Sequence, residues 1–112
     1  MGERRRMPKY LLQATYTPEG TKGLLQEGGS KRRAEVQKLV KGLGGKLEGL
    51  YYAFGESDVF VIADFPDHSS ATAASLAVNA SGTVKLKTTV LFTPEEMDEA
   101  VKKSVSYRAP GQ

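Results

Sequence analysis

Apolar positions recur along the chain with two periods, and the period predicts the kind of element. Alternation of apolar and polar residues, or a short apolar run, indicates a strand, whereas spacings of three and four residues indicate a helix. Four segments have the strand pattern: 10–16, 46–54, 58–65 and 84–92. Three have the helical pattern: 34–43, 69–80 and a last one that follows Thr93 and fades near Ser104. The segment 19–30, which contains four glycines, is predicted to be a loop that packs Leu24 and Leu25.

Residue types at the ends of these segments support the assignments. The glycines after residue 43 stop the first helix, and residues 55–57 form the turn of a β-hairpin. Asp67 or a neighbouring serine is expected to cap the second helix, and Thr93 followed by a proline opens the last one. The residues expected to fix these turns and ends are Gly20, Gly44, Gly45, Gly55, Pro66, Asp67 and Gly82.

The predicted order of elements is strand, helix, strand, strand, helix, strand, with a further helix at the C-terminus. This is the ferredoxin-like βαββαβ arrangement of the α+β class, in which two helices cover one face of a four-stranded antiparallel sheet. Because the helices cover only one face, the other face must meet solvent, a ligand or a second sheet. The uncovered face is therefore the first place to look for an interface.

The side-chain parity of the strands predicts which residues lie on each face. If Val59, Val61, Ala63 and Phe65 face the helices, then Phe60, Ile62 and Asp64 point to the uncovered side. The same logic sends Leu50, Tyr52 and Phe54, or else their neighbours, to that side. Phe60 and Ile62 would form an apolar patch there, and such patches usually mark an interface. We therefore expect a homo-oligomer, a dimer that packs sheet on sheet through the uncovered face.

The length and composition of the chain indicate one domain. A chain of 112 residues can bury a single core, so we expect a mobile basic tail at 1–7, one domain at 8–104 and a C-terminal tail at 105–112. The absence of cysteine excludes disulfides and thiolate chemistry. No apolar run is long enough to span a membrane and no signal peptide is recognisable, so we expect a cytoplasmic protein with no membrane partner.

The formal net charge of +3 says little about partners, because much of it comes from the basic clusters at residues 4–6 and 31–33. RNA-recognition motifs share the predicted order of elements, but their third strand needs a basic residue, a glycine and aromatic residues that stack on bases. The segment 57–65 has acidic residues where that signature needs basic and glycine residues. Nucleic acid is therefore not an expected partner.

Three patterns that could carry chemistry are incomplete. The segment Gly42–Lys46 lacks the first glycine and the final Ser or Thr of a phosphate-binding loop, and it leaves a helix instead of opening one. His68 is expected to be a solvent-exposed residue in the first turn of a helix, since a catalytic triad is built from distant segments. One histidine and scattered carboxylates do not make a metal-ligand set. We expect neither a metal nor a cofactor.

Two polar positions have both a structural and a functional interpretation. The basic residues Lys31–Arg33 open a helix, where the dipole disfavours cations. They either form a solvated junction or bring Arg32 or Arg33 to an anion. Asp58 precedes an apolar inner strand, where it can shape the turn by accepting backbone N–H bonds or pair with an arginine. As a catalytic base it would need a pKa raised by burial.

The run from Lys9 to about Glu96 resembles the GYD family, small proteins described largely as of unknown function. The features that carry the resemblance are Tyr16-Thr17, Gly20, Arg33, Leu43-Gly44-Gly45, Tyr51, Gly55, Asp58, Pro66-Asp67, Gly82 and Phe92-Thr93. Ser57 stands where the family's Gly-Tyr-Asp signature has tyrosine. The resemblance implies a ferredoxin-like fold related to the dimeric α+β barrels, in which small-molecule sites lie between sheet and helices.

Three functions are compatible with this resemblance. The first is an oligomeric small-molecule-binding or regulatory domain, whose ligand would contact Thr17, Arg33, Tyr51 and Asp58. The second is a cofactor-independent monooxygenase-like enzyme of the dimeric α+β barrel type. The third is a structural subunit of an assembly. The resemblance implies no particular reaction.

Overall fold

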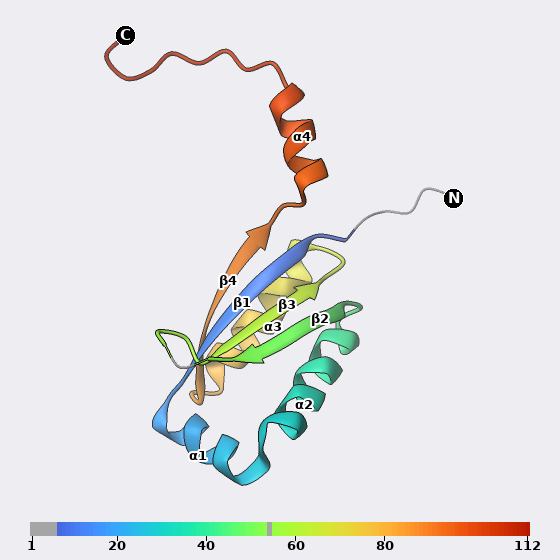
Figure 1. Ribbon diagram of the computed structural model, residues 1–112, viewed down its shortest axis with the longest axis vertical. Helices are drawn as coiled ribbons and strands as arrows, with labels where there is room; N and C mark the ends of the chain where they lie inside the picture. Colours follow the sequence, from blue (N-terminus) through green and yellow to red (C-terminus); the bar gives the residue numbers. More distant parts are fainter. Residues whose placement is uncertain (1–6, 54) are drawn as a thin grey trace.

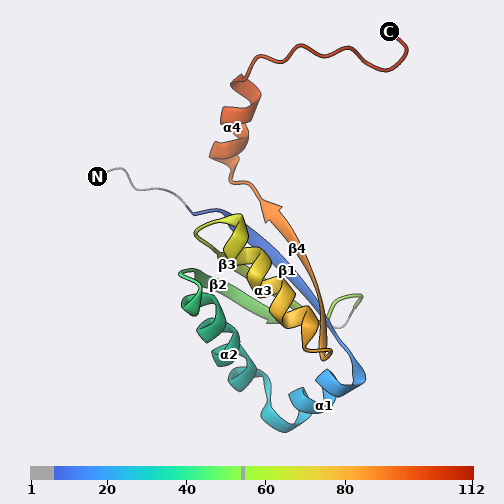
Figure 2. The same cartoon turned by 180° about the vertical axis from the view of Figure 1, so that it is seen from behind.

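The computed structural model describes residues 7–53 and 55–112. Its elements are β1 (Lys9–Tyr16), α1 (Pro18–Glu27), α2 (Gly29–Gly42), β2 (Lys46–Tyr52), β3 (Val59–Asp64), α3 (His68–Ala80), β4 (Val84–Leu91) and α4 (Pro94–Lys102) (Figure 1). The strands form one antiparallel sheet in the order β2-β3-β1-β4. Both α2 and α3 lie on the same face of this sheet (Figure 2). The ferredoxin-like α+β fold expected from the sequence is therefore confirmed.

The predicted loop at 19–30 is wrong, because most of this segment is helical. Thr17 caps α1, since its Oγ1 accepts a hydrogen bond from the Gly20 N–H at 3.3 Å, and Pro18 occupies the first turn. The helix ends at Gly28, whose positive φ of 84° turns the chain directly into α2. The first long helix therefore begins at Gly29 and not near residue 34. These local caps outweigh the low helix propensity of the glycines.

One of these glycines is required by packing. A Cβ atom built on Gly20 would lie 2.0 Å from the backbone oxygen of Thr83, so only glycine fits where α1 crosses the start of β4. The N–H of Thr17 donates to the same oxygen at 3.0 Å. The close contact thus ties the first helix to the loop before the last strand.

The remaining helix ends follow the sequence signals. Asp67 caps α3 by accepting a hydrogen bond from the Ser70 N–H at 2.8 Å. Thr93 and Glu96 form a reciprocal capping box at the start of α4. Both caps were predicted. Two predictions fall outside the described residues. They are the mobile basic tail, which was predicted at 1–7 and so consists mainly of residues 1–6, and the position of Phe54 on one face of the sheet.

The two faces of the sheet separate by parity as expected. Val59, Val61 and Ala63 are buried against the helices, whereas Phe60 and Ile62 lie half-buried on the other face. In β2 the register pairs Leu50 with Val61 and Tyr51 with Phe60. Leu50 and Tyr52 therefore lie on the helix side, and their neighbour Tyr51 lies on the uncovered side. A β-bulge between Leu47 and Gly49 sets this parity.

The core lies between the sheet and the two long helices. Its largest fully buried side chains are Tyr10, Phe65 and Val40. The rings of Tyr10 and Phe65 make an edge-to-face contact with centroids 5.7 Å apart. Helix α3 contributes only small residues to this core, Ala71 and Ala74. Alanines let the helix axis approach the sheet closely but fill little volume, which leaves space beside them.

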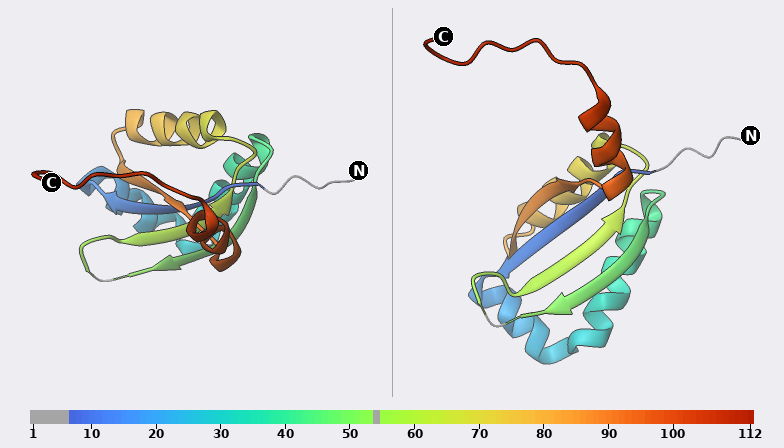
Figure 3. Two further views of the ribbon diagram at one scale, coloured as in Figure 1. Left: turned by 90° about the horizontal axis from the view of Figure 1, so that it is seen from above. Right: turned by 45° about the horizontal axis from the view of Figure 1, so that its top comes forward.

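Helix α4 stands apart from this two-layer body. It continues beyond the end of β4 (Figure 3), and no residue within it is buried. Among the described residues, no helix combines the length and apolar character that a membrane span requires.

Candidate functional site

A cavity of about 120 Å³ lies between the sheet and helices α2 and α3. Its walls are apolar and come from every strand and both helices; Leu12, Val36, Leu39, Leu50, Val61 and Leu86 are among them. Small side chains create the space, since Ala14 faces it from β1 and Ala74 from α3. An apolar cavity of this size stays dry and favours an apolar guest, because water inside it would lack hydrogen-bond partners.

One end of the cavity is polar. Tyr16, Arg32, Glu35 and Tyr52 line it there, from β1, α2 and β2. The Tyr52 hydroxyl donates to the backbone oxygen of Gly29 at 3.0 Å, which holds the ring against the start of α2. The Arg32 guanidinium lies 3.4 Å from a carboxylate oxygen of Glu27, in a partly exposed ion pair. Two phenols and a guanidinium thus converge at the mouth of an apolar chamber.

The Tyr16 phenol is held in its neutral form. Burial raises the pKa of Tyr16, the neighbouring Tyr52 phenol raises it further, and the charge of Arg32 opposes both. A neutral phenol has an O–H to donate, so Tyr16 can act as a hydrogen-bond donor near neutral pH. The mouth therefore presents a phenol donor and the Arg32 guanidinium, which pairs with Glu27, next to the Glu35 carboxylate.

The same two tyrosines also line an outer hollow of about 400 Å³. Thr21, Leu24 and the Gly28-Gly29 junction form its other sides. Tyr16 and Tyr52 thus stand between the inner cavity and a hollow that opens to solvent.

Two of the four predicted ligand-binding residues make structural hydrogen bonds. Thr17 caps α1, and its hydroxyl also donates to the backbone oxygen of Gly82 at 3.0 Å. A carboxylate oxygen of Asp58 accepts from the Tyr16 N–H at 2.9 Å, while the backbone N–H of Asp58 donates to Ala14 at 2.8 Å. Asp58 therefore joins the hairpin to β1, as its structural interpretation anticipated, and it also lines the outer hollow.

The other two predicted residues lie together elsewhere. Arg33 and Tyr51 line a shallow hollow at the β2 edge, together with Ser30 and Tyr52. The structure therefore divides the predicted site among two hollows and a helix cap and does not gather it in one pocket. Ligand contact by these four residues stays a prediction.

His68 lies at the start of α3 and is exposed, as predicted. It is nevertheless bonded, because its Nδ1 lies 2.5 Å from the hydroxyl oxygen of the buried Tyr10. The two rings meet edge to face with centroids 5.8 Å apart. Burial raises the pKa of Tyr10, and the charge of Asp67 adds to this effect. Tyr10 enters this pair although no sequence pattern marked it.

Tyr16 and Tyr52 at the cavity mouth were not among the predicted site residues. Tyr16 was noted only as part of a family pattern, and the parity of Tyr52 was left open between the two faces. Arg32 was one of two possible anion contacts, and the structure places Arg32 at the cavity and Arg33 away from it. The signal that could have identified Arg32 is its helical spacing from Val36 and Leu39, which line the same cavity.

Solved structures similar to this chain include two regulatory proteins. One is a leucine response regulatory protein from Mycobacterium tuberculosis, with a TM-score of 0.49, 10% identity and coverage of 82% of this chain and 60% of that chain. The other is a feast or famine regulatory protein from M. tuberculosis complexed with L-methionine, with a TM-score of 0.49, 10% identity and coverage of 99% of this chain and 65% of that chain. The chain thus spans less than two thirds of the length of either protein.

A third similar structure is a protein of unknown function from Nitrosomonas europaea, with a TM-score of 0.41, 19% identity and coverage of 78% of this chain and 91% of that chain. No curated protein matches the chain. The model of the GYD domain matches residues 10–101, which include all of the sheet except Lys9, helices α1 to α3 and most of α4. The chain therefore belongs to the GYD domain family.

Proposed function

We propose that this protein is a self-associating small-molecule-binding or regulatory domain whose ligand occupies the cavity between the sheet and α2 and α3. The observation that carries the proposal is an apolar chamber of about 120 Å³ with Tyr16, Arg32 and Tyr52 at one end. A ligand that fits has a small apolar body, of about the size of one aromatic ring. Its head group is a carboxylate or another hydrogen-bond acceptor, directed at the mouth.

Binding in this chamber would draw on two sources of free energy. Burial of the ligand's apolar body contributes about 25 cal/mol per Å² of surface removed from water. The head group adds charge-assisted hydrogen bonds to Arg32 and a neutral one to Tyr16, of which the charged kind is worth about 1.5–3 kcal/mol. The apolar term gives affinity, and the polar mouth gives a preference for acids over neutral analogues.

Self-association would use the uncovered sheet face. Leu11, Phe60 and Ile62 lie side by side on the central strands there, since the register pairs Leu11 with Ile62. They are only half-buried in the single chain. A contiguous apolar surface of this kind is typical of a protein–protein interface.

The binding proposal can be tested with benzoate and toluene, which share a ring and differ in the carboxylate. We expect both to raise the midpoint of thermal unfolding, benzoate at lower concentration. Ala74→Leu, which places a larger side chain in the cavity, should remove both shifts. Ala77→Leu lies on the exposed side of the same helix and is the matched control, expected to bind as wild type.

Arginine variants locate the head group. Arg32→Gln should weaken benzoate binding about tenfold and leave toluene unchanged, because only benzoate uses the charge. Arg33→Ala should bind both as wild type. If neither probe stabilises the wild type, or if Ala74→Leu still binds them, the cavity is not the site. A loss of benzoate binding in Arg33→Ala alone would move the site to the hollow at the β2 edge.

A further inference from the structure

Helix α4 has an apolar side that no residue in the described part of the chain covers. Met97 and Val101 lie one turn apart on this side and are 52% and 75% exposed. Phe92, which precedes the cap of the helix, is 66% exposed and extends the stripe toward β4. Leaving such side chains in water forfeits most of the free energy that their burial would provide. Burial of Phe92, Met97 and Val101 therefore requires an apolar surface on another molecule or on another part of the chain.

The junction between β4 and α4 directs the helix away from its own sheet. Only Phe92 and Thr93 separate the last residue of the strand from the first residue of the helix. The N–H of Thr93 donates to Glu96 Oε1 at 2.8 Å, and the N–H of Glu96 donates to Thr93 Oγ1 at 3.0 Å. Pro94 further fixes the backbone at the first helical position. A connection this short and this well bonded leaves α4 projecting beyond the sheet (Figure 3).

Helix α4 is mainly acidic. Its nine residues contain four acidic residues, Glu95, Glu96, Asp98 and Glu99, and one lysine, Lys102. Glu96 is engaged in the capping box. At about 100° per residue, Asp98 lies beside the Met97–Val101 stripe, whereas Glu95 and Glu99 lie on the opposite side of the helix. A partner surface for this helix should therefore be apolar at its centre and basic at its margins.

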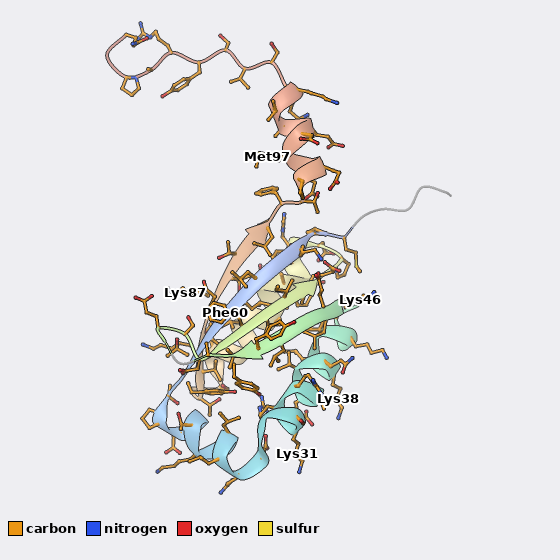
Figure 4. The ribbon with its side chains drawn as sticks, viewed as in Figure 1. Lys31, Lys38, Lys46, Phe60, Lys87 and Met97 are labelled. Carbon is orange, nitrogen blue, oxygen red and sulfur yellow. The ribbon has the colours of Figure 1, made fainter. Side chains whose placement is uncertain are left out.

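The uncovered sheet face is apolar at its centre and carries lysines at its margins, together with Asp64 and Glu48, which both pair with Lys9. Its centre contains Phe60 and Ile62, and the register places Lys87 of β4 in the same row as Phe60, with Gln13 between them. Lys85 and Lys46 lie on the same face, and none of these three lysines has a carboxylate within 4.0 Å in the described part of the chain. Figure 4 shows Lys87, Phe60 and Lys46 in this order across the sheet.

Packing the uncovered sheet faces of two copies directly against each other would give poorer charge complementarity than packing α4 on this face. In a two-fold dimer the same surface meets itself, so the lysine margins of both copies would be brought toward each other. Helix α4, with four acidic residues and one lysine, brings a net negative charge and the Asp98 carboxylate to these lysines instead. Complementary charge of this kind raises association rates and selects the partner.

We propose that α4 of one copy packs on the uncovered sheet face of a second copy, and that the two copies exchange their helices reciprocally. The Met97–Val101 stripe lies over the patch around Phe60, and Asp98 lies toward the lysines at its margin. The inference rests on the proposed self-association through this face and names the element that covers it.

Cysteine cross-linking tests the exchange directly, because the chain has no cysteine of its own. Chains with Met97→Cys and chains with Phe60→Cys are mixed and oxidised with a mild disulfide reagent. We expect a disulfide-linked heterodimer. Leu25→Cys, on an exposed site of α1, replaces Met97→Cys as the control and should give no such product with Phe60→Cys.

Sedimentation of variants separates this inference from self-association as such. Met97→Asp with Val101→Asp should raise the dimer dissociation constant at least about tenfold, because both anchors are lost. Leu25→Asp, which adds a charge at another exposed leucine, should dimerise as wild type. Lys87→Glu should weaken the dimer, and adding Asp98→Lys to it should restore part of the affinity. High salt should weaken the wild-type dimer.

Each outcome decides between the alternatives. A dimer that forms equally well with Met97→Asp and Val101→Asp would overturn the helix exchange and leave self-association through the sheet standing. A chain that is monomeric at all concentrations would overturn both. A cross-link that forms only within a chain carrying both Met97→Cys and Phe60→Cys would show that α4 folds back on its own sheet, which also contradicts the inference.

Discussion

The two faces of the sheet are built by the same four strands, yet their apolar residues are buried to different degrees. On the helix side, Val59, Val61 and Ala63 of β3 are almost inaccessible to solvent. On the other side, Phe60 and Ile62 of the same strand remain half-exposed, and Tyr51 beside them is 67% exposed. The helix side holds the core and the cavity, whereas the other side holds apolar area that the single chain leaves unused.

This difference separates residues that hold the fold together from residues that are available for association. Burial on the helix side has already contributed to the stability of the single chain. Burial on the uncovered side can contribute only when a second surface arrives. Substitutions on the two faces should therefore differ most in the free energy of unfolding of the monomer, which the following predictions address.

The largest effect is expected at Phe65, which is completely buried against Tyr10. Phe65→Ala should lower the free energy of unfolding by about 3–5 kcal/mol, from lost burial and the cavity left behind. Phe60→Ala on the uncovered face should lose only about 1 kcal/mol. Urea denaturation at a concentration that keeps the chain monomeric measures both. Equal losses would mean that the two faces do not differ as described.

Gly20 should be the next most sensitive position. Gly20→Ala places a Cβ 2.0 Å from the Thr83 backbone oxygen and should cost about 2–3 kcal/mol through displacement of α1. Gly23→Ala lies in the same helix with nothing within 4 Å of the added atom and should stabilise by up to about 1 kcal/mol. The pair of variants is compared by thermal unfolding. A tolerated Gly20→Ala would show that the close approach to Thr83 is not maintained.

A smaller, pH-dependent effect is expected from Tyr10 on the helix side. Burial raises the pKa of Tyr10 above 10.0 in the folded chain, so the folded state favours the protonated phenol. This contribution is complete below the unfolded pKa of about 10 and is lost as pH rises through the folded pKa. Stability should therefore fall less steeply above about pH 10 in Tyr10→Phe than in wild type. Parallel curves from denaturant titrations at several alkaline pH values would argue against burial of the phenol.

The smallest effects should come from two helix caps of the same residue type. Thr17→Ala removes the cap of α1 and its bond to Gly82, and should cost about 1–2 kcal/mol in global unfolding. Thr93→Ala removes the cap of α4, which packs on no core in the monomer, and should change global unfolding by less than about 0.5 kcal/mol. Amide exchange in α4 should nevertheless become faster. A large global loss in Thr93→Ala would mean that α4 is part of the monomer core.

The sequence predicted the strands, the long helices and two caps because each depends on local signals. The alternation around Val61 and the caps Asp67 and Thr93 need no knowledge of the rest of the chain. Helix α1 was missed because its glycines lower helix propensity, whereas Gly20 is required by contact with a residue far along the chain, Thr83. Tertiary packing decided that segment against its propensity.

The site was predicted less well than the fold. Asp58 and Thr17 were recognised as polar residues at loop ends, but the sequence does not show that their partners are backbone groups of Tyr16 and Gly20. The cavity depends on how much space α2 and α3 leave over small residues such as Ala74, and no local pattern encodes this space. Tyr52 faces the cavity because the bulge before Gly49 shifts the parity of β2.

That bulge also bears on solubility. β2 is an edge strand, and the free side of an edge strand can be extended by a strand from any other chain. The extra residue between Leu47 and Gly49 interrupts the regular spacing of hydrogen-bonding groups, and on the opposite edge Lys85 and Lys87 of β4 oppose the approach of a like-charged strand. The chain can therefore keep an apolar sheet surface for a chosen partner while its edges resist uncontrolled growth into fibres.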